Sequence, residues 1–447
     1  MKTKYQIIIL GLVTLLSRIP FLGAGYGSDP DAWRLADAAR KIIDTGQYTL
    51  SREPCHPVQE YITALFIGGG PWLVNGLTAL MSVAAVVFFA LVLMKWGLKN
   101  YLPAAMALAF VPVVYINSVN AMDYIWALGF IMVGLYFLSD RKYWLTGLMI
   151  GLAIGSRVTS GVFLIPFALI ILTNDNLKTM SDKIRPIIIM VGVALLTGII
   201  IYIPVYLRYG FDFWMFYEGA PTGFRDVMNL ATYGVWGFTG VLGIGLLLIL
   251  LSFFPGILCR TGKEINGQQL KLIRPLLIGI GIILVGFVRL PAESGYLIPI
   301  IPFILILMVI FFKRHAVIAF CLIMFLSSFI TITINGHSLD FDYGPVLTDH
   351  TSRVKGHAFV ENIFAAEAEM ADKSVVITAW WEPYLRIMHH PNPTKDIRYV
   401  YHVDRTRLDD WLSKGYTIYH LSYVEAYNLE NYGVDLTQVS QRLNVEY

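Results

Sequence analysis

Six ionisable side chains at the ends of apolar segments are the part of this 447-residue sequence that could do chemistry. They are Asp29, Asp31, Asp123, Arg157, Arg289 and Glu293. Charges at membrane depth are costly, so residues of this kind usually face a protein interior or an aqueous cavity. These acids and bases come from four separate parts of the chain. They form a site if the apolar segments bring them to one side of a membrane.

The composition indicates such a membrane. Hydrophobic residues make up 56% of the chain, charged residues only 15%, and the mean hydropathy is +0.61, more than a soluble domain can carry on its surface. No small-residue cleavage site closes the first apolar segment, so we expect a retained helix rather than a signal peptide. Segments of spanning length, or somewhat shorter, lie at roughly 5–22, 72–94, 101–117, 123–139, 143–155, 157–172, 186–207, 233–258, 275–290, 295–312 and 316–334. The sequence predicts a polytopic α-helical membrane protein with about 11 transmembrane helices within residues 1–334.

The basic residues predict the orientation of these helices. The gaps on one side of the membrane are short, yet they hold 15 of the 34 Lys and Arg. Basic residues concentrate in cytoplasmic loops, so the N-terminus is expected in the cytoplasm and the C-terminus outside a prokaryotic inner (plasma) membrane. The basic gaps all fall on this one side only if 143–155 and 157–172 form a hairpin of two short passes through the membrane. All six ionisable residues then fall on the external face.

The first external loop, about 23–60, is long for a connection. Its stretch "DAWRLADAARKIIDTG" has the amphipathic pattern of a helix ended by Gly46 and lying in the membrane interface. Asp29 before Pro30 can cap this helix, and Asp31 then sits in its first turn, where the helix dipole keeps a carboxylate ionised. Further along, His56 could bind a metal, shuttle a proton or simply hydrogen-bond within the loop.

Residues 335–447 differ in character. They hold 16 Asp and Glu against 10 Lys and Arg and contain no spanning segment. "KSVVITA" and "YTIYHLS" predict strands, and "EPYLRIMHH" and "YVEAYNLENYG" predict helices. We therefore expect a small external α/β domain at the C-terminus.

Short motifs in this chain resemble those of a known superfamily. "SRIPF" with Arg18, the acidic pair in "SDPDAWRLADAARKI", then "GQY" and "REPCHP" look like the first loop of the GT-C glycosyltransferases. The nearest branch is the one that includes protein O-mannosyltransferases and lipid A aminoarabinose transferases, the family 39-like branch. "GLAIGSRVTSGVFLIP" and "RLPAESGYLIPIIPF" are similar to later segments of that group. The resemblance covers about residues 1–335 as a pattern of spans.

The resemblance implies an enzyme that moves a sugar from a polyprenyl-phosphate carrier to a protein, lipid or glycan acceptor at the external face. It implies a first-loop acid as general base, and the motif "DPD" leaves Asp29 and Asp31 both open. A carboxylate can take the hydroxyl proton and stabilise the developing sugar cation, while guanidinium groups hold the phosphate. The basic candidates are Arg52, Arg157 and Arg289. Candidates for other substrate contacts are His56, Asp123, Glu293 and Tyr296.

No cofactor is required by this scheme, and a divalent metal stays open because the acids show no ligand spacing. Nucleic acid is not expected as a partner. Three alternatives remain. "TAWWEPY" at 378–384 resembles the acceptor motif of oligosaccharyltransferases, although a packed strand-to-helix corner explains it as well. A polysaccharide polymerase or ligase would also use a polyprenyl carrier. A lipid or solute transporter would need charges at mid-membrane, which are nearly absent here.

Overall fold

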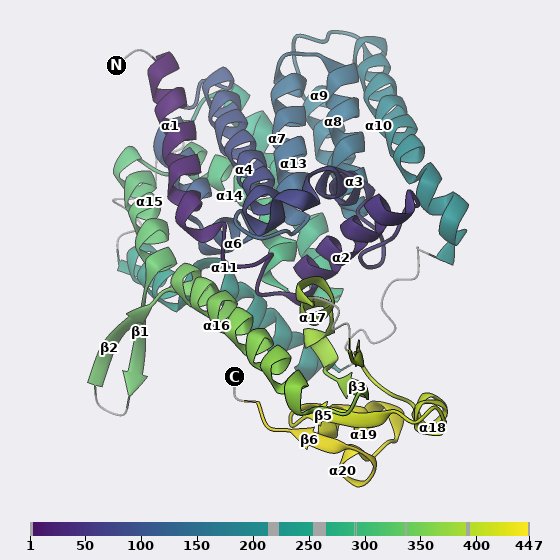
Figure 1. The fold of residues 1–447 in the computed structure, drawn as a ribbon. Helices are drawn as coiled ribbons and strands as arrows, with labels where there is room; N and C mark the ends of the chain where they lie inside the picture. Colours follow the sequence, from purple (N-terminus) through teal and green to yellow (C-terminus); the bar gives the residue numbers. More distant parts are fainter. Residues whose placement is uncertain are drawn as a thin grey trace.

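A computed structural model describes residues 3–212, 223–253, 265–289, 291, 293–335, 338–389 and 394–445. Apolar helices make up the larger part of it (Figure 1). They are α1 (Thr3–Arg18), α4 (Gly70–Lys95), α5 (Tyr101–Phe110), α6 (Pro112–Asn117), α7 (Tyr124–Ser139), α8 (Tyr143–Ser156), α9 (Leu164–Leu172), α10 (Met180–Tyr209), α11 (Phe224–Phe253), α13 (Gly267–Arg289), α14 (Ile301–Phe311) and α15 (Arg314–Phe329). Short 3-10 helices extend or join them: η1 (Ile19–Phe21), η2 (Ile67–Gly69), η3 (Val158–Phe163) and η6 (Ser294–Ile300).

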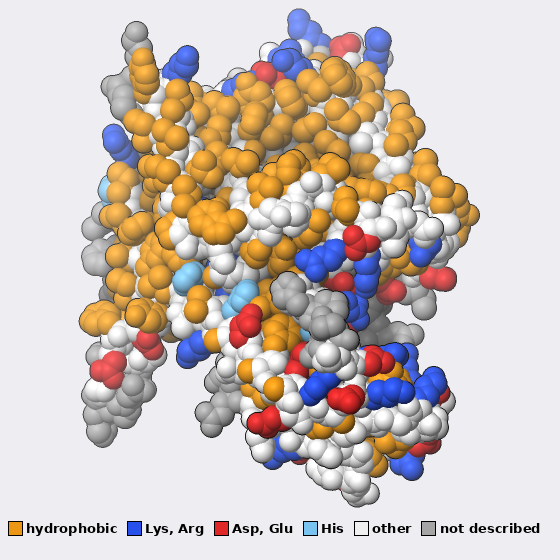
Figure 2. All heavy atoms as spheres, viewed as in Figure 1, with side chains coloured by type: hydrophobic (Ala, Val, Ile, Leu, Met, Phe, Trp, Pro, Cys, Tyr) orange, Lys and Arg blue, Asp and Glu red, His pale blue; other side chains and the backbone are white. Residues whose placement is uncertain are grey.

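The helices follow the predicted apolar segments. Five helical stretches are long and apolar enough to cross a membrane: Thr3–Phe21, Pro57–Lys95, Met180–Tyr209, Gly267–Val288 and Ser294–Phe311. Six shorter apolar helices in the described residues match the other predicted segments. The helix α8 and the helical segment that η3 and α9 form together are the two arms of the short hairpin expected around residue 157. Figure 2 shows a broad hydrophobic band over these helices, with Lys and Arg at the end where the N-terminus lies and, together with Asp and Glu, over the C-terminal part.

Two predicted spans differ from the structure. The segment 101–117 is broken between α5 and α6, because Pro112 has no N–H to continue the helix. The buried guanidinium of Arg18 donates to the Ala109 carbonyl near this break and to the Ser118 hydroxyl. The segment 316–334 does not stay helical to its end, since β1 (Ile330–Asn335) follows α15 and pairs antiparallel with β2 (Ser338–Tyr343). Its alternating β-branched residues, "ITITIN", favour a strand.

The first loop forms two helices, α2 (Pro30–Thr45) and α3 (Pro57–Phe66). The Asp29 carboxylate accepts the Asp31 N–H at 2.8 Å as the N-cap of α2, and Gly46 ends the helix with φ 67°. These are the boundaries expected from the sequence. The apolar face of α2, including Trp33, is buried and packs on α3 and on α17 (Glu382–Met388). Protein covers the face that we expected to meet the lipid interface.

The C-terminal part begins with α16 (Pro345–Ala366) and η7 (Glu367–Glu369). A four-stranded sheet follows, in the order β4-β3-β5-β6, and all its described pairings are parallel. Its elements are β3 (Lys373–Ile377), η8 (Ala379–Trp381), β4 (Asp396–Val400), α18 (Arg405–Ser413), β5 (Thr417–Leu421), α19 (Val424–Tyr432), α20 (Leu436–Val439) and β6 (Gln441–Leu443). The predicted strands and helices of this part lie where they were expected. In Figure 1 the sheet lies beyond α17, at the opposite end of the bundle from the N-terminus.

Candidate active site

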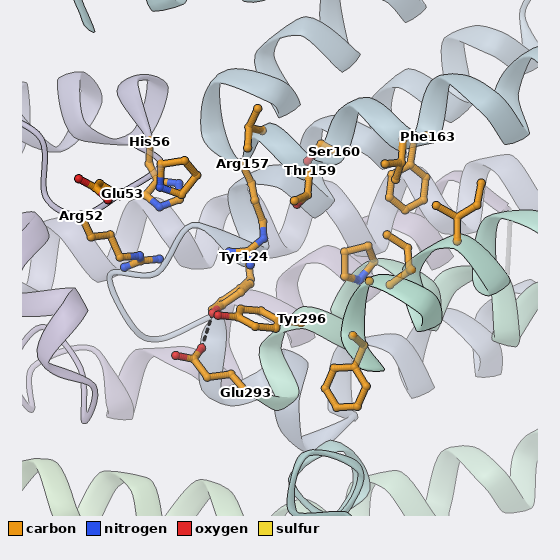
Figure 3. Close-up of a pocket in the computed structure, with 18 of the residues that line it drawn as sticks. Arg52, Glu53, His56, Tyr124, Arg157, Thr159, Ser160, Phe163, Glu293 and Tyr296 are labelled. Carbon is orange, nitrogen blue, oxygen red and sulfur yellow. Dashed lines mark hydrogen bonds between the residues drawn. The ribbon is translucent and has the colours of Figure 1, made fainter. Parts of the chain in front are cut away.

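A cavity of about 480 Å³ opens where the first loop meets α7, α8 and η6. One end is polar and includes Arg52, His56 and Arg157, and the other end is apolar and includes Phe163 and Phe287. Figure 3 shows this division, with the charged side chains on one side of the view and Phe163 on the other. The remaining lining residues are Asp31, Glu53, Pro54, Tyr124, Val158, Thr159, Ser160, Val162, Ile282, Ile283, Gly286, Glu293, Tyr296 and Pro299.

Asp123 lies behind the polar end and holds its cations together. Its side chain is fully buried and outside the cavity lining, and it pairs with Arg52 and, at 2.6 Å, with Arg157. Burial opposes ionisation of the Asp123 carboxyl, but the positive charges of Arg52 and Arg157 stabilise its carboxylate form. The expectation of a substrate contact at Asp123 does not fit this geometry, because its oxygens face the two arginines.

Arg157 is held rigidly at the tip of the hairpin between α8 and η3. Its guanidinium carbon lies 4.4 Å from the ring centroid of Tyr124 and 4.8 Å from that of Tyr296. A guanidinium stacked on two aromatic rings and paired with one buried carboxylate has few rotamers left. Because Asp123 pairs with both arginines, their combined charge of two exceeds its single negative charge. Two guanidinium groups therefore face the cavity, beside the carboxylates of Asp31, Glu53 and Glu293.

His56 lines the same polar end as a neutral imidazole. Burial is the main cause that lowers its pKa to about 4. Its Nδ1–H donates to the Ser156 carbonyl at 2.8 Å, which leaves Nε2 buried with no hydrogen-bond partner in the described structure. An unpaired imidazole nitrogen is a ready acceptor for a ligand hydroxyl. This supports a substrate contact, as the sequence suggested.

The two first-loop aspartates have different surroundings. Asp31 pairs with Arg34 at 2.7 Å and has Arg52 Nε at 3.4 Å. No Lys or Arg in the described part of the chain lies within ion-pair distance of Asp29, and burial together with the neighbouring Asp31 charge raises its pKa. Asp31 is therefore a compensated anion, whereas Asp29 is a carboxylate poised to accept a proton.

Glu293 completes an acidic group with these aspartates. It accepts a hydrogen bond from the Tyr124 hydroxyl (Figure 3), and its pKa is raised by burial and by the Asp29 charge. Ligand atoms of Asp29, Asp31 and Glu293 lie within 4.8 Å of one another. Three carboxylates at this spacing can hold a hard divalent cation. Sequence spacing gave no sign of it, because Glu293 is more than 250 residues away along the chain.

Several residues of the site escaped the sequence reasoning. Tyr124 contacts Arg157 and Glu293, yet in sequence it is one more aromatic residue of an apolar segment. Glu60 accepts hydrogen bonds from the Tyr48 hydroxyl, the Ser51 N–H at 2.7 Å and the His56 N–H at 3.2 Å, and so shapes the loop that carries Arg52. Glu60 lies at the end of the predicted first external loop, outside the predicted spans, so its depth gave no signal. The backbone of Arg289 ends α13, but its side chain lies outside the described residues.

A second cavity, of about 340 Å³, lies on the other side of Tyr124 and Glu293, which line both cavities. Asp29 lines this second cavity, while Asp31 lines the first. The other residues around it are Ser28, Ile116, Asn117, Asn120, Met122, Ser294 and Gly295. The two aspartates thus face different spaces.

The "TAWWEPY" stretch forms a corner between β3 and α17. Trp381 packs on Phe359, with ring centroids 4.9 Å apart, whereas Trp380 is 41% exposed and stacks on Tyr423. The expected corner is present, but only one of its tryptophans is in the core.

The helices are apolar, a cavity with charged residues lies at one end of them, and the helical first loop lines this cavity. These are the features of an integral membrane protein. Its fold is also found in solved structures, and the likeness is consistent with the sequence resemblance. Two solved structures show this: ArnT from Cupriavidus metallidurans bound to undecaprenyl phosphate has a TM-score of 0.61 at 12% identity, over 99% of this chain and 90% of that one. The apo state of the same protein has a TM-score of 0.56 at 12% identity, over 98% and 88%. No protein-family model and no curated protein matches the sequence.

Proposed function

We propose that this protein is a glycosyltransferase that takes a sugar from a polyprenyl-phosphate carrier and places it on an acceptor at the external face of the inner membrane. The observation that carries this proposal is the first cavity, whose polar end, with Arg52 and Arg157, continues into an apolar end. A lipid phosphate has the same two parts. Arg52 and Arg157 would bind the phosphate through charge-assisted hydrogen bonds, and the apolar end would take the first isoprene units. The solved ArnT structure with bound undecaprenyl phosphate supports such a donor.

Asp29 is the general base in this scheme. It takes the proton of the acceptor hydroxyl while the acceptor oxygen forms a bond to the anomeric carbon. The bond between that carbon and the phosphate oxygen breaks, and its electron pair leaves with the polyprenyl phosphate. Arg52 and Arg157 stabilise the charge that the phosphate gains. Asp31 and Asp123 act as positioning residues, because their oxygens are already paired with arginines.

The topology follows from the same scheme. We propose eleven spans, a cytoplasmic N-terminus and an external C-terminal α/β domain formed by residues 335–447. The 15 Lys and Arg in the short gaps on one side of the predicted spans support this orientation. A periplasmic activity reporter fused after residue 340 should be active. Activity only in a cytoplasmic reporter would reverse the orientation and place the site on the wrong side.

Binding of undecaprenyl phosphate tests the donor site. Native mass spectrometry of the purified protein should show one bound lipid, and Arg157→Ala should weaken this binding by about tenfold to a hundredfold, the value of a charge-assisted contact. Arg185→Ala, at an exposed position of α10, is the matched control and should bind like the unmodified protein. Equal binding by both variants would remove the phosphate role from Arg157.

A further inference from the structure

The second cavity indicates what kind of acceptor the protein uses. This inference rests on the function proposed above. We propose that this cavity binds a neutral acceptor through its hydroxyl groups, such as a terminal sugar of a glycan, and excludes an acceptor phosphate. The cavity adjoins the donor cavity across Tyr124 and Glu293, so an acceptor held there lies next to the transferred sugar.

The polar groups that face this space are mainly hydrogen-bond acceptors. Asp29 and Glu293 are carboxylates with no cation in direct contact within the described chain. Asn120 is 3% exposed, and its Oδ1 has no hydrogen-bond partner. The neighbouring Asp349 carboxyl favours the amide orientation in which the Asn120 N–H₂ group faces it, because a carboxylate accepts hydrogen bonds. A buried unpaired oxygen beside two carboxylates calls for a ligand that donates hydrogen bonds.

Charge separates the two cavities further. Arg52, His56 and Arg157 line the first cavity beside Asp31, Glu53 and Glu293, whereas no Lys, Arg or His among the described residues lines the second. Without a bound divalent cation, a phosphate beside Asp29 and Glu293 would meet like charge and no Lys, Arg or His in the described cavity wall, which is strongly unfavourable. A hydroxyl brings the proton that Asp29 can remove, while a phosphate anion already has a free oxygen and needs no base. The arrangement therefore suits an alcohol nucleophile.

The size of the cavity agrees with this class of acceptor. Its volume of about 340 Å³ lies at the small end of small-molecule sites, which span about 300–1,000 Å³. Such a space takes the reacting end of an acceptor, about one sugar ring, with the remainder of the molecule outside. Ser28, Asn117 and Ser294 add small polar groups to its wall.

Two acceptor probes with the same alkyl chain test the inference: decyl glucoside, which is neutral, and decyl phosphate. The protein is placed in lipid nanodiscs together with the polyprenyl-phosphate sugars extracted from the membranes of the producing cells, and mass spectrometry measures the glycosylated probes. We expect the neutral probe to be glycosylated about a hundredfold faster, given the size of like-charge penalties. Equal or faster transfer to decyl phosphate would overturn the inference, as would no transfer to either probe by protein that binds undecaprenyl phosphate.

Undecaprenyl phosphate binding, measured on the same sample, separates the two proposals. Its absence overturns the proposed function, whereas binding without the acceptor preference overturns only the inference. Asn120→Leu should lower transfer to decyl glucoside at least about tenfold, because it removes the unpaired oxygen, and should leave undecaprenyl phosphate binding unchanged, which also shows that the variant is folded. Asn431→Leu, at an exposed position of α19, should change neither. Unchanged transfer by Asn120→Leu would contradict the role of this cavity.

Discussion

The phenol ring of Tyr384 stacks on the indole of Trp33, with centroids 4.3 Å apart and ring planes 27° apart. The Tyr384 hydroxyl also donates to the Ser28 carbonyl at 2.9 Å, and Ser28 directly precedes Asp29. The C-terminal part therefore holds the start of α2 from the side away from the membrane helices. The Ser28 hydroxyl adds a second tie, at 2.6 Å to Asp349 of α16.

Removing the Tyr384 ring should disturb catalysis more than binding. Aromatic pairs contribute about 0.5–1.5 kcal/mol beyond their buried area, so we expect Tyr384→Ala to lower kcat about fivefold to tenfold through misplacement of Asp29. Undecaprenyl phosphate affinity should stay the same, because Arg52 and Arg157 are untouched. Tyr384→Phe keeps the stack and should restore most of kcat. Tyr343→Ala, at an exposed position of β2, is the control. A rise in KM alone would contradict the positioning role.

Asp29 and Asp31 should respond differently to the same substitution. Loss of a general base costs about 10²–10⁴ in rate, so Asp29→Asn should lower kcat by that amount with little change in donor affinity. Asp31→Asn should instead act on donor binding, because Asp31 holds Arg52. Steady-state transfer kinetics of both variants provide the measurement. Equal losses of kcat would mean that the structure has not distinguished the two carboxylates.

The pH dependence of transfer should report Asp29. Its pKa is raised in the folded protein, by burial first and by Asp31 second, and a general base works only above its pKa. The rate should therefore fall as the pH decreases through a value higher than about 3.9, that of an ordinary aspartate. The Arg34 charge opposes this shift, so Arg34→Ala should move the fall to still higher pH. A shift to lower pH would contradict the assignment. Arg405→Ala, on exposed α18, should leave the profile unchanged.

Asp123 should matter for stability in a way that a lipid phosphate can offset. Removing one partner of a buried ion pair costs about 3–5 kcal/mol, so Asp123→Asn should lower the Tm of the protein. Its two arginines would then lack their anion, and undecaprenyl phosphate should raise the Tm of this variant more than that of the unmodified protein. Asp140→Asn breaks only a surface pair with Lys95 and serves as the control. Equal Tm increases would contradict the argument.

Hydropathy and local pattern predicted much of this structure. The eleven apolar segments, the α2 boundaries at Asp29 and Gly46, and the strands β3 and β5 all follow from short-range signals. The signal for the break at Pro112 is also local. It was missed because the residues on both sides of it are apolar, so that the hydropathy predicts one continuous span. The strand after α15 was missed for the same reason, since "ITITIN" is as apolar on average as a helix end.

The site was predictable as a set of residues but not as an arrangement. Because the charged residues lie at the external ends of the predicted spans, we expected Arg157 and Glu293 near Asp31. All three line the first cavity. Nothing in the sequence shows that Asp123 turns to Arg52, 71 residues away, or that Tyr124 separates two cavities. Ion pairs and cavity walls are set by tertiary packing, which single-sequence patterns do not record.

The contacts of Arg18 bear on how the chain is assembled. Arg18 is the last residue of the first helix. Its partners Ala109 and Ser118 are translated 91 and 100 residues later. A charged group has no stable place in lipid without such partners. The first helix must keep Arg18 at the headgroup level during synthesis and can settle into its final position only after α5 and α6 have entered the bilayer. Biogenesis of the membrane bundle therefore has a built-in order, in which the first helix is fixed only after α5 and α6 have followed it.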